Sequence, residues 1–383
     1  MRRLILWACC LLPSLLLGQG TMLYQGISAY EQENYPEAIR TLSTLIEAKL
    51  PFEGGQLSQA HFYLAQAYWQ VSQEAKFSQD YPQALLRAYN HLTAAKRLDK
   101  VQRYQTACET TTSLLLPALY EAGTQAYNRG DYELASQYFD RTYQLTPSKK
   151  EALLAKGYAL WQIHDSVSAV KCWEKATVQK PIRMLQPQID QYASALAQVV
   201  HARSSWGQVS QARETLQRAF NQYPNHPQLI EADLDLFLSH PDILTNGQKH
   251  FQDQVDRNEG NLDWKAALAH YHYYRGNTME AISLFEQIQR QDSDHDSSNR
   301  FLASHYVSAA KSLLDGLAPL RGEARENQQE AILQNLLESL PYLSQLHEND
   351  PERLLWLEQL IAISEYLDLS KAKAYRKELR KIR

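Results

Sequence analysis

Apolar residues recur along most of the chain at the spacing of an amphipathic helix, in paired stripes divided by short polar breaks. The clearest pair occupies residues 119–127 and 132–143, with the break at residues 128–131. Side chains three and four positions apart share one face of a helix, so each stripe predicts a helix with one buried face. Pro147 ends the second helix, because proline lacks a backbone donor and disfavours helical conformation in the residue before it. The pattern therefore predicts a succession of helix–turn–helix units.

The landmarks of one unit return 34 residues later in the next unit. The matched pairs are Gly123 and Gly157, Ala135 and Ala169, Phe139 and Trp173, Thr142 and Ala176, and Pro147 and Pro181. The glycine lets the second helix approach the first, and the aromatic residue fills the space beside it. One such unit cannot bury both of its faces alone, so stacked neighbours must complete the core. We therefore predict an all-α solenoid.

These landmarks resemble the tetratricopeptide repeat (TPR) family, whose unit is a helix–turn–helix with small, aromatic and proline positions. The two best units carry Gly123, Tyr132, Ala135, Phe139 and Pro147, and then Gly157, Ala169, Trp173, Ala176 and Pro181. Weaker units carry Gly26, Leu64, Gly207, Leu234, Gly276 and Leu302. The resemblance implies a right-handed superhelical solenoid of TPR-like helix–turn–helix repeats.

The repeats divide the chain into three expected segments. Residues 1–20 form an export signal, and residues 21–310 form an array of about seven to eight units with an insertion near residues 71–82. Residues 311–383 contain a second insertion and C-terminal helices that cap the array. Terminal units of a solenoid normally present a polar outer face, which suits the last helical pair predicted at residues 351–366 and 369–383.

The first residues have the three-part layout of a secretory signal peptide. Arg2 and Arg3 precede an apolar run over residues 4–17, and Gly18-Gln19-Gly20 places small residues at a cleavage site. Cys9 and Cys10 leave a lipoprotein signal as an alternative. We expect an exported protein, periplasmic or associated with the cell envelope, or secreted. The remaining cysteines, Cys108 and Cys172, are expected to be buried free thiols.

Composition and motifs narrow the chemistry. A formal net charge of -4 does not provide the basic footprint of a nucleic-acid binder, and 14 glycines and 14 prolines disfavour an all-β chain. A metalloprotease motif fails after His347-Glu348. A calcium loop at Asp292, Asp294 and Asp296 fails because Ser297 stands at its glycine position, so we expect Asp and Ser to cap the next helix there. We predict no enzyme, no metal and no cofactor.

The resemblance also places a binding surface. In TPR proteins the first helix of each pair lines a concave groove that holds extended or helical peptides. On this sequence that face carries Tyr30, Phe62, Gln66, Trp69, Tyr120, Thr124, Tyr127, Leu154, Tyr158, Trp161, His201, His270 and Tyr273. The stripe is aromatic, and Tyr and Trp provide large contact areas with a polar tip. Some TPR proteins hold a peptide's terminal carboxylate with lysine, arginine and asparagine on this face. Here Arg300 is the lone cation on that face, so we do not expect such a clamp.

The expected function is a non-catalytic scaffold or adaptor that binds a protein or peptide partner in this groove. An exported binder of a glycan or small ligand, using the same aromatic face, is the alternative. The tail carries seven cations between Lys371 and Arg383. They suit the negative end of a helix dipole, or alternatively peripheral docking to anionic lipid or an acidic partner.

Overall fold

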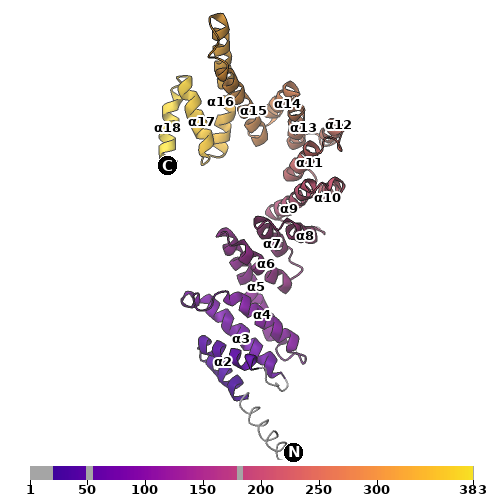
Figure 1. Cartoon of the computed structure of the whole chain (residues 1–383), viewed down its shortest axis with the longest axis vertical. Coiled ribbons are helices and arrows are strands. Elements are labelled where there is room, and N and C mark those ends of the chain that lie inside the picture. The colour runs from indigo at the N-terminus through magenta and orange to yellow at the C-terminus, as the bar shows by residue number, and fades with distance from the viewer. Residues whose placement is uncertain (1–19, 49–54, 179–183, 383) are drawn as a thin grey trace, which may run out of the picture. The chain divides into compact units, whose positions relative to one another are not determined.

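The computed structural model describes residues 20–48, 55–178 and 184–382. All regular elements in these ranges are helices, so the predicted all-α fold is confirmed. The predicted signal peptide lies outside the described residues except for Gly20, which begins a helix that runs to residue 31. The chain divides into two compact units, Met1–Ala195 and Leu196–Arg383 (Figure 1).

The helices of the first unit follow one another in short antiparallel pairs. After the helix at residues 20–31 come α2 (Tyr35–Glu47), α3 (Gln56–Gln73), the 3₁₀ turn η1 (Ala75–Phe77), α4 (Ala84–Leu98), α5 (Gln105–Asn128), α6 (Tyr132–Leu145), α7 (Glu151–Gln162) and α8 (Ser166–Thr177). Helix α9 (Gln186–Ser205) crosses the boundary between the units. Helix α3 packs on α4, α5 on α6, and α6 on α7, as stacked repeats require.

The second unit continues the same order. Its helices are α10 (Val209–Gln222), α11 (Pro227–Ser239), α12 (Gly247–Arg257), α13 (Leu262–Tyr274), α14 (Thr278–Gln291), α15 (Asp296–Asp315), α16 (Glu323–Asn349), α17 (Leu354–Tyr366) and α18 (Lys371–Ile382). Helix α11 also contacts α13, so first helices of successive pairs lie side by side. The first helices of this unit are therefore α11, α13, α15 and α17.

The glycines of the two best repeats allow the close helix approach that the sequence predicts. A Cβ on Gly123 of α5 would lie 2.7 Å from Cε1 of Phe139 on α6. A Cβ on Gly157 of α7 would lie 2.6 Å from Cδ1 of Trp173 on α8, whose ring is fully buried. Both aromatic rings thus occupy the space that any larger residue would need.

Helix α5 begins earlier than the apolar stripe at residues 119–127 predicts. Its first half is rich in Thr and Ser, whose hydroxyls donate to the helix's own carbonyls, as Thr111 does to Ala107 O at 2.9 Å. Cys108, Thr111 and Leu115 continue the buried face at helical spacing. The prediction missed this half because threonine is polar by type although it is buried here.

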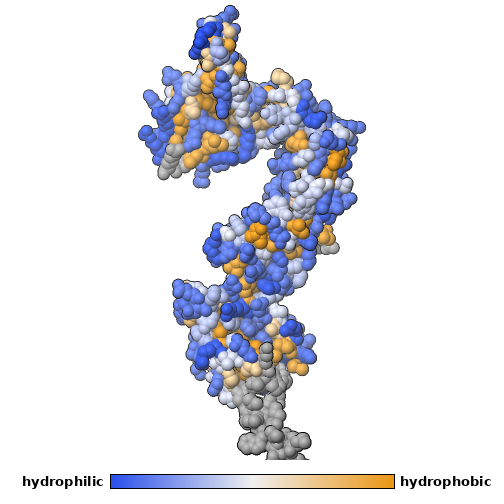
Figure 2. All heavy atoms as spheres, viewed as in Figure 1, coloured by the Kyte–Doolittle hydropathy of each residue, from blue (hydrophilic) through white to orange (hydrophobic). Residues whose placement is uncertain are grey.

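The two insertions extend neighbouring helices. Helix α3 continues to Gln73 and is followed by η1, and α15 continues to Asp315 before a short connection to the long helix α16. In Figure 2 the visible surface of this C-terminal segment is mostly hydrophilic at the far end of α16. No helix among the described residues is long and apolar enough to cross a membrane.

Candidate binding grooves

The first helices of unit 1 are joined by a ladder of polar side chains. Tyr30 Oη donates to Gln66 Oε1 at 3.3 Å, and Gln66 Nε2 donates to Thr111 Oγ1 at 2.9 Å. The ladder therefore runs from the helix at residues 20–31 through α3 to α5. It brings together two residues of the predicted face, and adds Thr111, which the sequence analysis missed. These polar groups are therefore hydrogen-bonded to one another and are not free to bind a ligand.

The predicted aromatic residues on α3 are largely interior. Phe62 is 7% exposed and stacks on Tyr104 at 5.3 Å between ring centroids, so it belongs to the core and has little surface for a ligand. Trp69 is half-buried against the same core. The structure therefore leaves α3 a smaller candidate surface than the sequence predicts.

The predicted residues on α5 pack toward the second helix of their pair. The Tyr120 ring lies 5.5 Å from that of Phe139, and the Tyr127 ring lies 5.1 Å from that of Tyr132. Thr124 donates to Tyr120 O. Tyr120 remains 37% exposed, so it alone of this group presents a substantial aromatic surface.

The same packing recurs on α7. Tyr158 and Trp161 lie 5.2 and 5.6 Å from the ring of buried Trp173, and Tyr158 Oη donates to Gln191 O at 3.4 Å. Both side chains are half-buried, and Leu154 is buried. The aromatic residues predicted on the first helices of unit 1 thus pack mainly against the second helices of their own pairs, which stabilises those pairs.

Unit 2 holds an open groove. Side chains from all four first helices, α11, α13, α15 and α17, line one cavity of about 1010 Å³. His270 and Tyr273, both predicted from sequence, lie in it together with Tyr274, Phe301 and Trp356. Tyr273 and Tyr274 are 42% and 65% exposed, so the groove presents accessible aromatic surface.

Acidic side chains dominate the charged lining of this groove. The carboxylates come from Glu231, Asp235, Asp263, Asp292, Asp294 and Asp296. Arg300 is the guanidinium in the lining, and its Nε already pairs with Asp296 Oδ2 at 2.7 Å. Since like charges around one cleft sum their potentials, the groove attracts cations.

Histidines at the groove have structural roles. His270 Nε2 lies 3.1 Å from Ser297 Oγ, and its ring meets Phe285 edge-on at 4.9 Å. Burial, with the charge of nearby His295 as a second cause, lowers the pKa of His270 to about 4, so it is neutral near pH 7. His201 stands beside the groove, with Nδ1 3.8 Å from Asp235 Oδ2.

The connection before α15 corrects one prediction. His295, rather than Asp or Ser, is the N-cap, and its Nδ1 accepts from Ser298 N at 3.3 Å. Its other nitrogen lies 3.6 Å from Asp263 Oδ1, which holds the ring toward α13. The aspartates before α15 are left exposed at the groove.

The described residues offer no metal cluster. Within residues 20–48, 55–178 and 184–382, no group of three or more His, Cys, Asp or Glu side chains could hold a metal ion. Cys108 and Cys172 are free thiols, as predicted, although Cys172 is only half-buried. Burial raises the pKa of both thiols, which keeps them protonated and unreactive.

These features define a class, a helical-repeat protein with an open groove lined by successive first helices. Profiles described as tetratricopeptide repeat match residues 23–95 and 120–180, and a second such profile matches residues 186–226. The chain therefore carries tetratricopeptide repeats over these residues, in agreement with its landmarks.

Solved structures resemble the chain only at the level of the fold. The MamA protein is 16% identical, covers 46% of this chain and 92% of its own, and has a TM-score of 0.34. YrrB, a TPR protein with an unusual peptide-binding site, is 16% identical, covers 47% of this chain and 88% of its own, and has a TM-score of 0.30. A thermophilic TPR protein of Thermus thermophilus is 18% identical, covers 46% and 92%, and has a TM-score of 0.31. A search of curated proteins gave no match.

Proposed function

We propose that the chain is a non-catalytic scaffold that binds a segment of a partner protein in the groove of unit 2. The observation that carries this proposal is the convergence of four first helices on one cavity of about 1010 Å³. The TPR fold is consistent with a protein-interaction scaffold. The partner segment carries basic side chains together with apolar ones, because the lining combines an excess of carboxylates, six against one arginine, with exposed tyrosines.

The two kinds of lining have different roles. Tyr273 and Tyr274 provide contact area, and their ring centroids lie 5.8 Å apart, which holds the two rings edge-to-face. Rigid aromatic side chains of this kind provide most of the binding free energy of many interfaces. Glu231, Asp235 and Asp263 attract the partner and orient its cations, and this contribution weakens with salt.

The first experiment uses fluorescein-labelled peptides and anisotropy with the full chain. One peptide alternates lysine with leucine and phenylalanine, and its counterpart has glutamate at each lysine position. We expect the cationic peptide to bind, and to bind more weakly as the salt concentration rises from about 0.05 to 0.3 M, because the Debye length shortens. Equal binding of the glutamate peptide would refute the electrostatic part of the proposal.

Matched variants locate the site. Tyr273→Ala should weaken binding of the cationic peptide by about tenfold or more, as expected for an aromatic anchor. Tyr366→Ala is the control, because Tyr366 is 52% exposed in the same unit and lies outside the groove lining. An equal loss in both variants, or none in Tyr273→Ala, would exclude the groove. Displacement of the peptide by oligosaccharides would favour the glycan-binding alternative instead.

We also propose that the chain is exported and acts at the cell envelope or outside it. Support comes from the basic, apolar and small-residue order of residues 1–20. N-terminal sequencing of the protein purified from its source should find Thr21 as the first residue. An intact Met1 in the purified protein would contradict export by this signal, and a lipid-modified Cys10 would assign the protein to the lipoproteins.

A further inference from the structure

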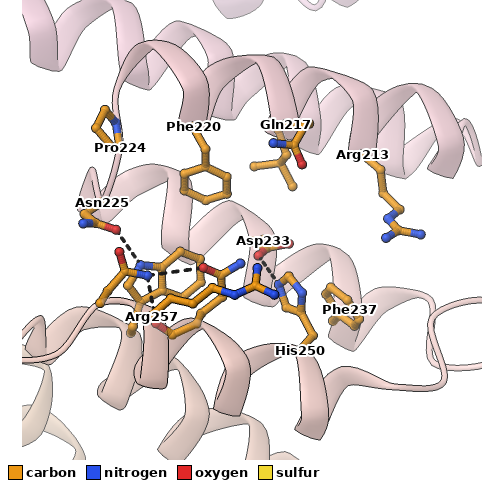
Figure 3. A pocket seen from close by; sticks show the side chains of 13 residues that line it. Arg213, Gln217, Phe220, Pro224, Asn225, Asp233, Phe237, His250 and Arg257 are labelled. Atoms are coloured by element: carbon orange, nitrogen blue, oxygen red, sulfur yellow. Dashed lines mark hydrogen bonds and ion pairs between the residues drawn. The ribbon is translucent and has the colours of Figure 1, made fainter.

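A second cavity in unit 2 lies on the other side of α11 and α13, against the second helices α10 and α12. Its volume is about 300 Å³, near the lower end of the range for small-ligand pockets. Figure 3 shows its lining side chains. The groove uses Leu234 and Ala267, whereas this pocket uses Asp233, Phe237 and Trp264, so the two sites occupy different faces of the same helices.

Aromatic rings form the apolar part of the pocket. Phe220 points from α10 into it, 5.4 Å from the ring of Trp264 (Figure 3). Trp264 is 1% exposed and its indole Nε1 donates to Asn225 Oδ1 at 2.9 Å, which fixes the ring plane. Phe237 stacks on His250 at 4.6 Å between centroids. Trp264 and Phe237 are therefore buried in the wall of the pocket, and half-buried Phe220 presents the aromatic surface that a flat ligand can reach.

The carboxylate in the lining already has a hydrogen-bond partner. Asp233 is 5% exposed, and its Oδ2 accepts from His250 Nε2 at 2.6 Å. The amides are occupied as well, since Asn258 donates to Gln254 and Asn225 accepts from Trp264. Most polar groups of the pocket are therefore already hydrogen-bonded to other groups of the protein.

Two guanidiniums remain. Arg213 of α10 and Arg257 of α12 both line the cavity, and in the described part of the chain neither makes a hydrogen bond or ion pair. In Figure 3 Arg257 extends toward His250 while Arg213 points down from the opposite helix. A cation is favoured in its own right at the C-terminal end of α12, but Arg213 near the start of α10 has no such reason. Two like charges facing one cavity favour an anion between them.

We propose that this pocket binds a small planar anion, one aromatic ring in size, that carries a carboxylate or a phosphate. The ring lies against Phe220, and the anionic group accepts hydrogen bonds from Arg213 and Arg257. Guanidinium groups suit this role because their planar fork matches the two oxygens of a carboxylate or phosphate. The site does not depend on the peptide groove, so either proposal can fail without the other.

The test uses fluorine NMR of 4-fluorophenyl phosphate and 4-fluorobenzoate added to the full chain. Neutral 4-fluorobenzamide reports the contribution of charge, and competition by inorganic phosphate reports the contribution of the ring. We expect both anions to bind at least about tenfold more tightly than the neutral amide, and inorganic phosphate to compete poorly. Equal binding of the amide, or no binding of either anion at millimolar concentration, would overturn the proposal.

Variants localise the binding. The double variant Arg213→Gln/Arg257→Gln should lose at least about tenfold in affinity for the anions. Arg218→Gln/Arg275→Gln removes two exposed guanidiniums outside the lining and should bind as the wild type does. Phe220→Leu should weaken 4-fluorobenzoate binding while leaving circular dichroism unchanged. Unaltered binding in the first double variant or in Phe220→Leu would overturn the assignment. Displacement by a glutamate-rich peptide at lower concentration than by 4-fluorobenzoate would assign the pocket to a protein partner and reject a small ligand.

Discussion

Gly157→Ala tests the packing rule on which the repeat prediction rests. The new Cβ would lie 2.6 Å from Trp173 Cδ1, so the buried indole must move. Overpacking of this kind costs about 1–3 kcal/mol. Displacement also threatens the hydrogen bond from Trp173 Nε1 to Leu154 O at 3.2 Å, which contributes about 0.5–1.5 kcal/mol. The higher helix propensity of alanine opposes these two effects and stabilises the helix by up to about 1 kcal/mol. The net expectation is a destabilisation of about 2 kcal/mol.

Urea unfolding followed by circular dichroism measures this change in the free energy of unfolding. Gly55→Ala is the control, because no atom lies within 4 Å of its added Cβ; Gly55 is the N-cap of α3, so the change should cost about 1 kcal/mol or less, equally with and without the Trp173 ring. The mechanism predicts coupling with Trp173. In a Trp173→Val background, where the ring is gone, Gly157→Ala should cost nothing and can stabilise the helix. An equal cost in both backgrounds would refute the reasoning, as would a cost below about 0.5 kcal/mol in the wild type.

Two further predictions concern stability in unit 2. Because the pKa of His270 is about 4 when folded and near 6.5 when unfolded, the unfolded state binds more protons between these values, so stability falls as pH drops through this window. His270 alone should remove about 2 kcal/mol between pH 7.5 and 5.0, and urea titrations of His270→Gln should show that much less pH dependence than the wild type; parallel curves would contradict this. Asn225→Ala leaves the buried Trp264 Nε1 without its acceptor and should cost about 1–3 kcal/mol by the same assay, whereas an unchanged midpoint would mean that another acceptor replaces it.

The fold was predictable because its signals are local. The glycine and aromatic pairs at Gly123, Phe139, Gly157 and Trp173 each record a contact between adjacent helices, and the structure places every pair in contact. The first half of α5 was missed for the opposite reason. Its threonines are polar by type, and only the structure shows that Thr111 is buried with its hydroxyl bonded to a carbonyl one turn back.

The candidate site was harder to predict than the fold. A stripe of aromatic residues on a first helix looks the same in sequence whether it faces a ligand or its own neighbours. Tyr158 and Trp161 pack on Trp173, while Tyr273 lies open in a groove, and this difference depends on the next helices along the solenoid. The acidic lining was missed because the repeat containing α11 is degenerate, so Glu231 and Asp235 were not assigned to the inner face.

The two units use the same helix face in different ways, and this difference suggests where recognition occurs. In unit 1 the polar side chains of that face bond one another, as in the ladder through Gln66, and the aromatic rings support the second helices. A partner would have to compete with bonds already made there. In unit 2 the corresponding face keeps carboxylates exposed and leaves Tyr273 and Tyr274 partly in solvent. Asp296 pairs with Arg300, but Tyr273 and Tyr274 keep exposed ring surface that a partner can contact without breaking a protein hydrogen bond. We therefore expect variants of Tyr273 to impair partner binding more than variants of Trp161, which should act mainly on stability.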